Sequence, residues 1–199
     1  MINISIKKLE KSLGYKIGKN IFCLAIDTAT TSGITKMWIN SNDVKIDTFT
    51  IKCPSPPKET EENSEKYEEF IGMATVIFKD FSKTIKEDKN KSLLVLENSF
   101  LGLNVGTYGF LKVMMGILHT LLYDYFEDIK IYYPTQARKL VGFHSELKRK
   151  KGMTSKEKTE ARKERKAEII KFVNNVLDSD IKDDNIADSL MLAFAALKL

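Results

Sequence analysis

Short apolar runs, each long enough for one β-strand, alternate along this chain with longer segments in which apolar residues recur every three or four positions. The strand-length runs are residues 21–27, 34–40, 44–52, 92–97 and 129–133. The segments with helical periodicity are residues 59–85 and 108–126, and a basic stretch at about residues 155–177 and a last segment at about residues 184–199 are also expected to form helices. Strands that alternate with helices form a mixed sheet that is covered on both faces. The sequence therefore predicts an α/β protein with a mixed five-stranded sheet flanked by helices.

The length of 199 residues suits a single domain with its own core. Residues 1–20, where lysines alternate with single apolar residues, are interpreted as a short basic N-terminal extension to a domain over residues 21–199. The extension lacks the features of a secretory signal, and no apolar run approaches the ~20 residues that span a membrane. Cys23 and Cys53 are too few for a disulfide scaffold or a zinc cluster. We therefore expect an intracellular protein with reduced thiols and no membrane partner.

Positive charge is concentrated in one part of the chain, although the net charge is only +5. Ten lysines and arginines fall between Lys148 and Lys166, against three glutamates, and a basic insertion spans about residues 143–163. Such a cluster attracts polyanions by counterion release, which makes nucleic acid the expected partner. The residues that we expect to bind DNA here are Lys148, Arg149, Lys150 and Lys151. Charge alone leaves a solvated lysine-rich helix as the alternative.

Four carboxylates stand where apolar segments begin or end. Asp27 and Glu97 each end a strand-length apolar run, and Asp184 and Asp188 begin the last helical segment. Burial of an ionised carboxylate costs several kcal/mol unless the group is paired or binds a cation. Residues four apart share a helix face, so Asp184 and Asp188 would project toward one point. Carboxylate oxygens suit Mg²⁺ or Mn²⁺, and two such ions support phosphodiester hydrolysis. The alternative is that these residues serve only helix caps and turns.

Five segments resemble motifs of the RuvC-type Holliday junction resolvases, in the style of their phage and poxvirus members. They are Asp27-Thr-Ala-Thr-Thr-Ser-Gly33, Glu97-Asn-Ser-Phe100, Tyr133-Pro-Thr-Gln-Ala-Arg-Lys-Leu-Val-Gly142, Lys166-Ala-Glu-Ile-Ile170 and Asp184-Asn-Ile-Ala-Asp188-Ser-Leu190. Their order and spacing carry the resemblance, which covers about residues 21–197. The resemblance implies a ribonuclease H-like fold and a Mg²⁺-dependent endodeoxyribonuclease that resolves four-way or branched DNA junctions.

The resemblance also implies a role for each matched residue. Asp27, Glu97, Asp184 and Asp188 would hold Mg²⁺ or Mn²⁺, with two ions in each active site. Lys166 would stabilise charge at the scissile phosphate, and Phe100 would stack on a base exposed at the junction centre. Paired cuts across a junction imply a homodimer, and such an enzyme would act at a nucleoid or at a site of viral replication.

Two features depart from the family pattern. The residue three positions before the last aspartate is Asn185, where the family usually has an acid or a histidine, so we assign the ligand role to Asp184 instead. The basic insertion at about residues 143–163 is longer than the usual loop at this point, which leaves the preferred substrate open.

Two other functions fit parts of the sequence. The segment around Asp27 also resembles the opening of ASKHA-type ATPases and of the non-catalytic scaffold TsaB. The ATPases need a second Asp-x-Gly loop and a Gly-Gly motif that this chain lacks, and a scaffold does not explain Glu97 or the basic cluster. A ribonuclease H that acts on RNA–DNA hybrids is the alternative among nucleases.

Overall fold

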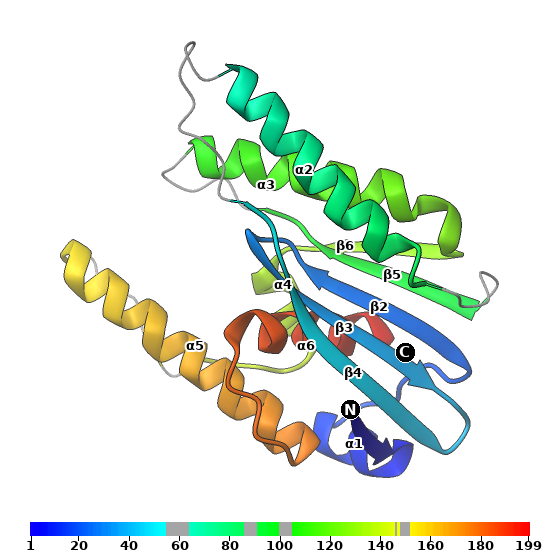
Figure 1. Ribbon diagram of the computed structural model, residues 1–199. Helices are drawn as coiled ribbons and strands as arrows, with labels where there is room; N and C mark the ends of the chain where they lie inside the picture. The colour runs from blue at the N-terminus through cyan, green and yellow to red at the C-terminus, as the bar shows by residue number, and fades with distance from the viewer. Residues whose placement is uncertain (55–63, 86–90, 100–104, 146, 148–151) are drawn as a thin grey trace.

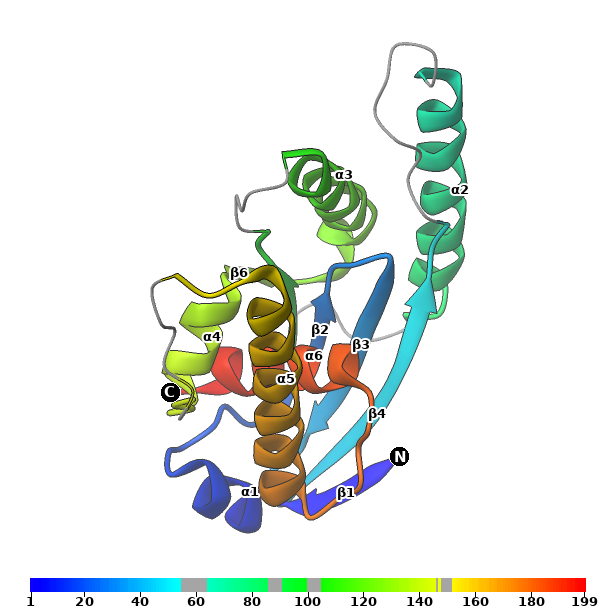
Figure 2. The ribbon, with the colours of Figure 1, turned by 90° about the vertical axis from the view of Figure 1, so that its left-hand side faces the viewer.

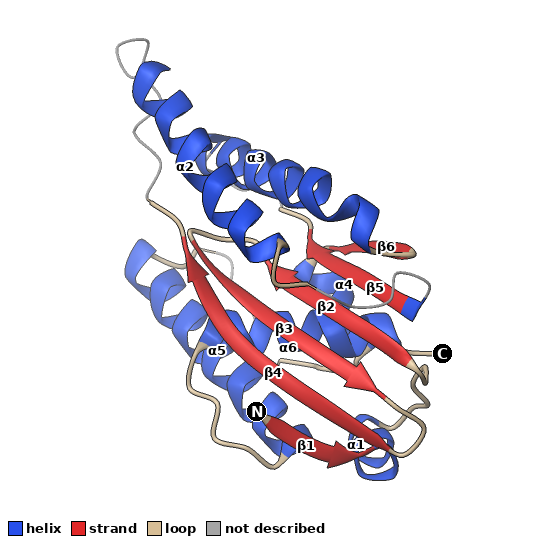
Figure 3. Cartoon of the chain, turned by 45° about the vertical axis from the view of Figure 1, so that its right-hand side comes forward, coloured by secondary structure: helices blue, strands red, loops and turns tan. Residues whose placement is uncertain are grey.

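A computed structural model describes residues 1–54, 64–85, 91–99, 105–145, 147 and 152–199 (Figure 1). The six strands of one mixed sheet are arranged in the order β1-β4-β3-β2-β5-β6 (Figure 3). They are β1 (Ile2–Ser5), β2 (Ile21–Asp27), β3 (Thr31–Ile39), β4 (Asp43–Lys52), β5 (Ser92–Glu97) and β6 (Asp128–Tyr132). Strands β1 to β4 pair in antiparallel fashion, and β5 and β6 run parallel to β2. The predicted α/β class with a mixed sheet is confirmed.

The predicted number of strands was wrong, because the described part of the chain forms a sheet of six strands and not five. The additional strand is β1, which pairs with β4 at the edge of the sheet. Its four residues carry only two apolar side chains, Ile2 and Ile4, so the segment was not distinguished from the lysine-rich sequence around it. Residues 1–20 thus contain a sheet strand and also a helix, α1 (Ile6–Leu13).

Helices cover both faces of the sheet, as Figures 1 and 2 show. One face carries α2 (Ser64–Ser82) and α3 (Val105–Leu122), which is followed by the short 3₁₀ helix η3 (Tyr123–Tyr125). The other face carries α1, α4 (Pro134–Leu140), α5 (Ser155–Leu177) and α6 (Asp184–Leu197). Among the described residues, no helix is both long and apolar enough to cross a membrane.

Helix α4 was not among the expected helices, because Pro134 directly follows the strand expected at residues 129–133. Proline has no backbone N–H and its fixed φ suits the first position of a helix, where that N–H has no partner inside the helix. Pro134 occupies this position in α4. The consequence matters for the site, because α4 carries a charged residue that the sequence alone did not place.

The alternation of side chains along the two central strands decides which residues reach α6. Cys23 and Ala25 of β2 pack in the core on the α6 face, and so does Val95 of β5. Successive side chains of a strand point to opposite faces. Asp27 and Glu97 are two residues further along the same strands, so both carboxylates belong to the α6 face.

Candidate active site

Gly33 allows the first turn of α6 to approach the sheet closely. It pairs with Asp27 in the β2–β3 ladder. A Cβ atom at position 33 would lie 1.9 Å from the carbonyl oxygen of Asn185, so only glycine leaves room for the helix. One turn further along α6, Thr35 Oγ1 and Ser189 Oγ share a buried hydrogen bond of 2.7 Å. These contacts hold the beginning of α6 beside the C-terminal end of β2.

Three of the four predicted carboxylates come together at this point. Asp27 is only 7% exposed and shares a hydrogen bond with Glu97. Burial, followed by the charges of Glu97 and Asp188, raises the pKa of Asp27 well above its usual range. Burial and the charge of Asp188 raise the pKa of Glu97 to about 7. Asp27 and Glu97 therefore favour protonation in this desolvated place unless a cation neutralises the charge of the cluster.

Two basic side chains lie against the aspartates of α6. Arg138, from α4, donates to Asp188 Oδ1 over 2.9 Å, and both side chains are largely buried. Lys166, from α5, forms an ion pair with Asp184. Burial raises the pKa of Asp27, as stated above, and the charge of Lys166 opposes this rise. The site thus combines a carboxylate cluster with two cations from separate helices.

Asp184 is connected to the cluster less directly than the other acids. The carboxylate of α6 that acts on both Asp27 and Glu97 is Asp188. Asp184 lies one turn earlier and pairs with Lys166. Asn185 donates its backbone N–H to Asp183, the N-cap of α6, and its carbonyl faces Gly33. The assignment of Asp184, rather than Asn185, as a metal ligand stays a prediction.

The side chains at this site are of the type that binds a divalent cation, although their arrangement does not form a complete set of metal ligands. Within the described residues, no three acidic, histidine or cysteine side chains are arranged to hold a metal ion. The carboxylate oxygens are, however, the hard donors that Mg²⁺ prefers. Thr28 Oγ1 and Ser99 Oγ, beside the ends of β2 and β5, are buried without a hydrogen-bond partner in the described part of the chain. Buried polar atoms of this kind are rare, and a bound ion or an ordered water would satisfy them.

The sequence did not identify two basic residues near the site. Arg138 was missed because its helix, α4, was missed. Lys112, in α3, donates to Asn98, the residue that follows Glu97. It is the one lysine or arginine in α3, so a single cation in an otherwise apolar helix was a usable signal. The predicted DNA-binding residues Phe100 and Lys148, Arg149, Lys150 and Lys151 lie outside the described residues.

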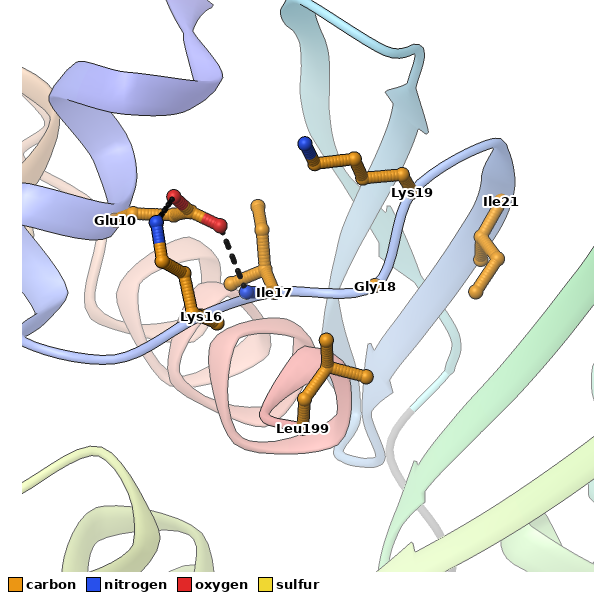
Figure 4. Close-up of a pocket in the computed structure, with 7 residues that line it drawn as sticks. All are labelled: Glu10, Lys16, Ile17, Gly18, Lys19, Ile21 and Leu199. Atoms are coloured by element: carbon orange, nitrogen blue, oxygen red, sulfur yellow. Dashed lines mark hydrogen bonds and ion pairs between the residues drawn. The ribbon is translucent and has the colours of Figure 1, made fainter.

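A surface pocket lies at the opposite end of β2 from the carboxylates (Figure 4). Its lining includes Glu10 and Lys16, and the C-terminal residue Leu199 lies beside it. Lys16 Nζ donates to Glu10 Oε2 over 2.7 Å, and the backbone N–H of Ile17 donates to Oε1 over 3.2 Å. Both oxygens of this carboxylate are therefore satisfied by the protein itself.

Comparison with known proteins finds likeness in structure but not in sequence. No protein-family model and no curated protein matches the chain. The structure of Thermus thermophilus RuvC in complex with a Holliday junction substrate is similar, with a TM-score of 0.57 and 12% identity over 88% of this chain and 92% of that one. A second T. thermophilus RuvC structure has a TM-score of 0.55, 12% identity and the same coverage. The yeast mitochondrial Holliday junction resolvase Ydc2 has a TM-score of 0.52 and 11% identity over 95% of this chain and 84% of that one. The chain thus has the ribonuclease H-like fold of these resolvases.

Proposed function

We propose that this chain is a metal-dependent endonuclease that cuts four-way or branched DNA by hydrolysis of phosphodiester bonds. One observation carries the proposal. Asp27, Glu97 and Asp188 come from three separate elements and meet in a buried cluster that the protein leaves short of positive charge. The cluster lies at the carboxyl ends of two parallel neighbouring strands, β2 and β5, in a fold shared with junction resolvases.

The proposed roles follow from these positions. Asp27, Glu97 and Asp188, with Asp184 beside them, would hold Mg²⁺ or Mn²⁺. Two such ions, when bound, would activate a water molecule and stabilise the leaving oxygen. Lys166 would stabilise negative charge at the scissile phosphate, since its ammonium group lies at the edge of the cluster. Arg138 would hold Asp188 in place through their hydrogen bond. Phe100 and Lys148 to Lys151 keep their proposed role as contacts to DNA.

We also propose that the active form is a homodimer. Two symmetric cuts in a roughly two-fold junction call for two sites related by a dyad. Helix α3 would provide a surface for this contact. Its Met114 and Leu118 are buried against the sheet, whereas Met115 and Leu121 remain partly exposed. Light scattering at micromolar protein should give the mass of a dimer, and a monomer in the presence of junction DNA would contradict this part of the proposal.

The direct test uses a labelled four-way junction, a linear duplex and an RNA–DNA hybrid of the same sequence. We expect paired nicks placed symmetrically across the branch point of the junction, in the presence of Mg²⁺ only. Excess EDTA should abolish cutting. Preferential cutting of the RNA strand in the hybrid would replace the proposal with a ribonuclease H. Cutting in EDTA would exclude the metal mechanism.

A further inference from the structure

Helix α5 has two halves with different surroundings. Its C-terminal half packs in the core through Ile169, Val173, Val176 and Leu177. Its N-terminal half, residues 155–166, is exposed at most positions and projects beyond the sheet and its covering helices (Figures 1 and 3). We refer to residues 155–166 as the α5 arm. At 1.5 Å per residue, the arm is about 18 Å long.

The start of the arm is fixed by local chemistry rather than by packing. Thr154 is the N-cap, and its hydroxyl accepts the backbone N–H of Glu157 while the Glu157 carboxylate accepts the Thr154 N–H. This capping box stabilises the first turn of a helix that has no core contact there. The chain therefore maintains an ordered helix at a place where the fold itself gains nothing from it.

Basic side chains form one continuous stripe along the arm. Lys158, Arg162 and Lys166 are spaced four residues apart and form one stripe along the helix. Glu160 and Glu164 are each offset by two residues from this stripe, which corresponds to about 200° of rotation in an α-helix. The side of the arm opposite the basic stripe carries Glu160 and Glu164 together with Lys156 and Lys163, so charges of both signs are mixed there.

This arrangement is unfavourable for an isolated helix. Like charges at a spacing of four repel each other, whereas a helix stabilised by its own charges places opposite signs at this spacing. Within the described residues, the one ion pair inside the arm joins Lys163 and Glu160, and both side chains are well exposed. A polyanion that lies against the basic stripe would relieve this repulsion.

The basic stripe also has a direction, because it ends at the candidate active site. Lys166, its last member, forms the ion pair with Asp184 at the beginning of α6. Arg162 and Lys158 lie one and two turns further out along the same side. A polyanion that contacts Lys166 at the site can therefore continue along Arg162 and Lys158 without a change of direction.

We propose that the basic stripe of the α5 arm binds the phosphate backbone of one duplex arm of a branched DNA substrate as it leaves the active site. The inference rests on the proposed nuclease function and adds a defined contact surface to it. An anionic membrane is a poorer match, because a helix that lies on a membrane needs an apolar face. The exposed positions of the arm are all charged or polar.

The test compares K158Q/R162Q with a matched control, K7Q/K11Q. The control also removes two exposed cations four residues apart on one helix, α1, at the opposite end of the sheet. Lys166 is left intact because it belongs to the site. Binding of a fluorescent four-way junction and of a linear duplex is measured by anisotropy over a range of salt concentrations, with the D27N background preventing cleavage.

We expect K158Q/R162Q to lower the slope of log Kd against log salt by ~1.8, since each lost phosphate contact contributes ~0.9. Affinity at ~0.1 M salt should fall about tenfold or more, equally for junctions of different sequence. K7Q/K11Q should leave both quantities near those of the parent. Both variants should keep the parent melting temperature, because neither pair of lysine or arginine side chains is buried.

The outcomes separate this inference from the proposed function. An unchanged slope, or an equal loss in both variants, would overturn the role of the arm even if the wild type cuts junctions normally. A slope lowered only in K158Q/R162Q, with no cutting by the wild type in Mg²⁺, would support the arm and refute the nuclease. Loss of binding to phosphatidylserine vesicles, with DNA binding unchanged, would assign the stripe to a membrane and overturn the inference.

Discussion

Glu10 and Asp27 are buried to almost the same extent, with 8% and 7% of their surfaces exposed, but their surroundings differ. Glu10 lies near the start of β2 and accepts hydrogen bonds from Lys16 and from the backbone of Ile17 (Figure 4). The hydrogen bond from Lys16 is the main reason why the pKa of Glu10 is lowered. Asp27 lies at the far end of β2, and burial together with neighbouring carboxylates raises its pKa.

The comparison distinguishes a carboxylate that stabilises the folded protein, Glu10, from one that does not, Asp27. A buried charge with its own cation and N–H donors is compensated within the protein. A buried acid that faces other acids destabilises the native state and is kept where it has another task. The two ends of β2 therefore make opposite predictions for the removal of a carboxylate.

The largest effect is expected from the pair D27N and E10Q. D27N removes a charged ligand and keeps the shape of the side chain, so junction cutting should fall by at least ~10³-fold while junction binding survives. E10Q should leave cutting unchanged and lower the melting temperature, because Lys16 loses its partner. Cleavage rates and thermal melts on the same preparations provide the measurement. If D27N cut junctions at the wild-type rate, Asp27 would have no functional role that sets it apart from Glu10.

A second prediction locates the boundary of the functional cluster on α6. An ionised carboxylate binds Mg²⁺ far better than a neutral amide does. Asp184→Asn should therefore abolish Mg²⁺-supported cutting, Asn185→Ala should cost much less, and Asn185→Asp should be tolerated. If Asp184 served only to stabilise the start of α6, D184N would lose ~1 kcal/mol of stability and keep its activity. An inactive N185A with an active D184N would show that the ligand is Asn185.

A third prediction concerns the contact that brings α6 to the end of β2. Gly33→Ala places a Cβ atom against the Asn185 backbone, which cannot move aside as a flexible side chain would. We expect a loss of about 2–3 kcal/mol in the free energy of unfolding, as for other overpacked sites, and a loss of cutting. Gly72→Ala is the matched control, because the space around this helical position in α2 is open. It should stabilise the protein by about 0.5–1 kcal/mol. A neutral G33A would show that α6 is not held by this contact.

The elements around the two ends of β2 were predictable from the sequence to different degrees. The bounds of β2 and β5 follow from the sequence, because each is a continuous apolar run that ends in an acidic residue. Segments β1 and α4 were missed, since each is short and its pattern spans barely one repeat. The residues of the candidate site were therefore also predictable to different degrees. Acids at the ends of predicted strands were found, whereas Arg138, on a missed helix, was not.

The sequence also could not reveal the contrast between Glu10 and Asp27. Both are single acids beside apolar residues, and only the packing shows that Lys16 faces one and that Glu97 and Asp188 face the other. Long-range pairings such as that of Lys166 with Asp184 depend on how α5 and α6 cross, which no local pattern specifies. The ligand assignment on α6 stays a prediction for the same reason.

The smallest expected effect is in the pH dependence of stability, and E97Q measures it. The pKa of Glu97 in the folded protein is raised to about 7, above its ordinary value of 4.5. The stability that the protonated group provides is therefore complete below pH ~4.5 and is lost as the pH rises through ~7. E97Q stays neutral and avoids this loss. In EDTA it should match the wild type near pH 5 and exceed it by about 1–2 kcal/mol near pH 8, since part of the shift is shared with Asp27.

Glu10 supplies the control of opposite sign for this experiment. Its pKa is lowered in the folded protein, so its contribution is present above its ordinary value and is lost as the pH falls. E10Q should therefore be less stable than the wild type at pH 8, and the gap should close toward pH 3. Urea unfolding of the three proteins between pH 3 and pH 9 provides the comparison. Added Mg²⁺ should stabilise the wild type more than E97Q, because only the wild type keeps the full set of acids. An E97Q protein that is less stable than the wild type at pH 8 in EDTA would show that the cluster is compensated within the protein, as Glu10 is.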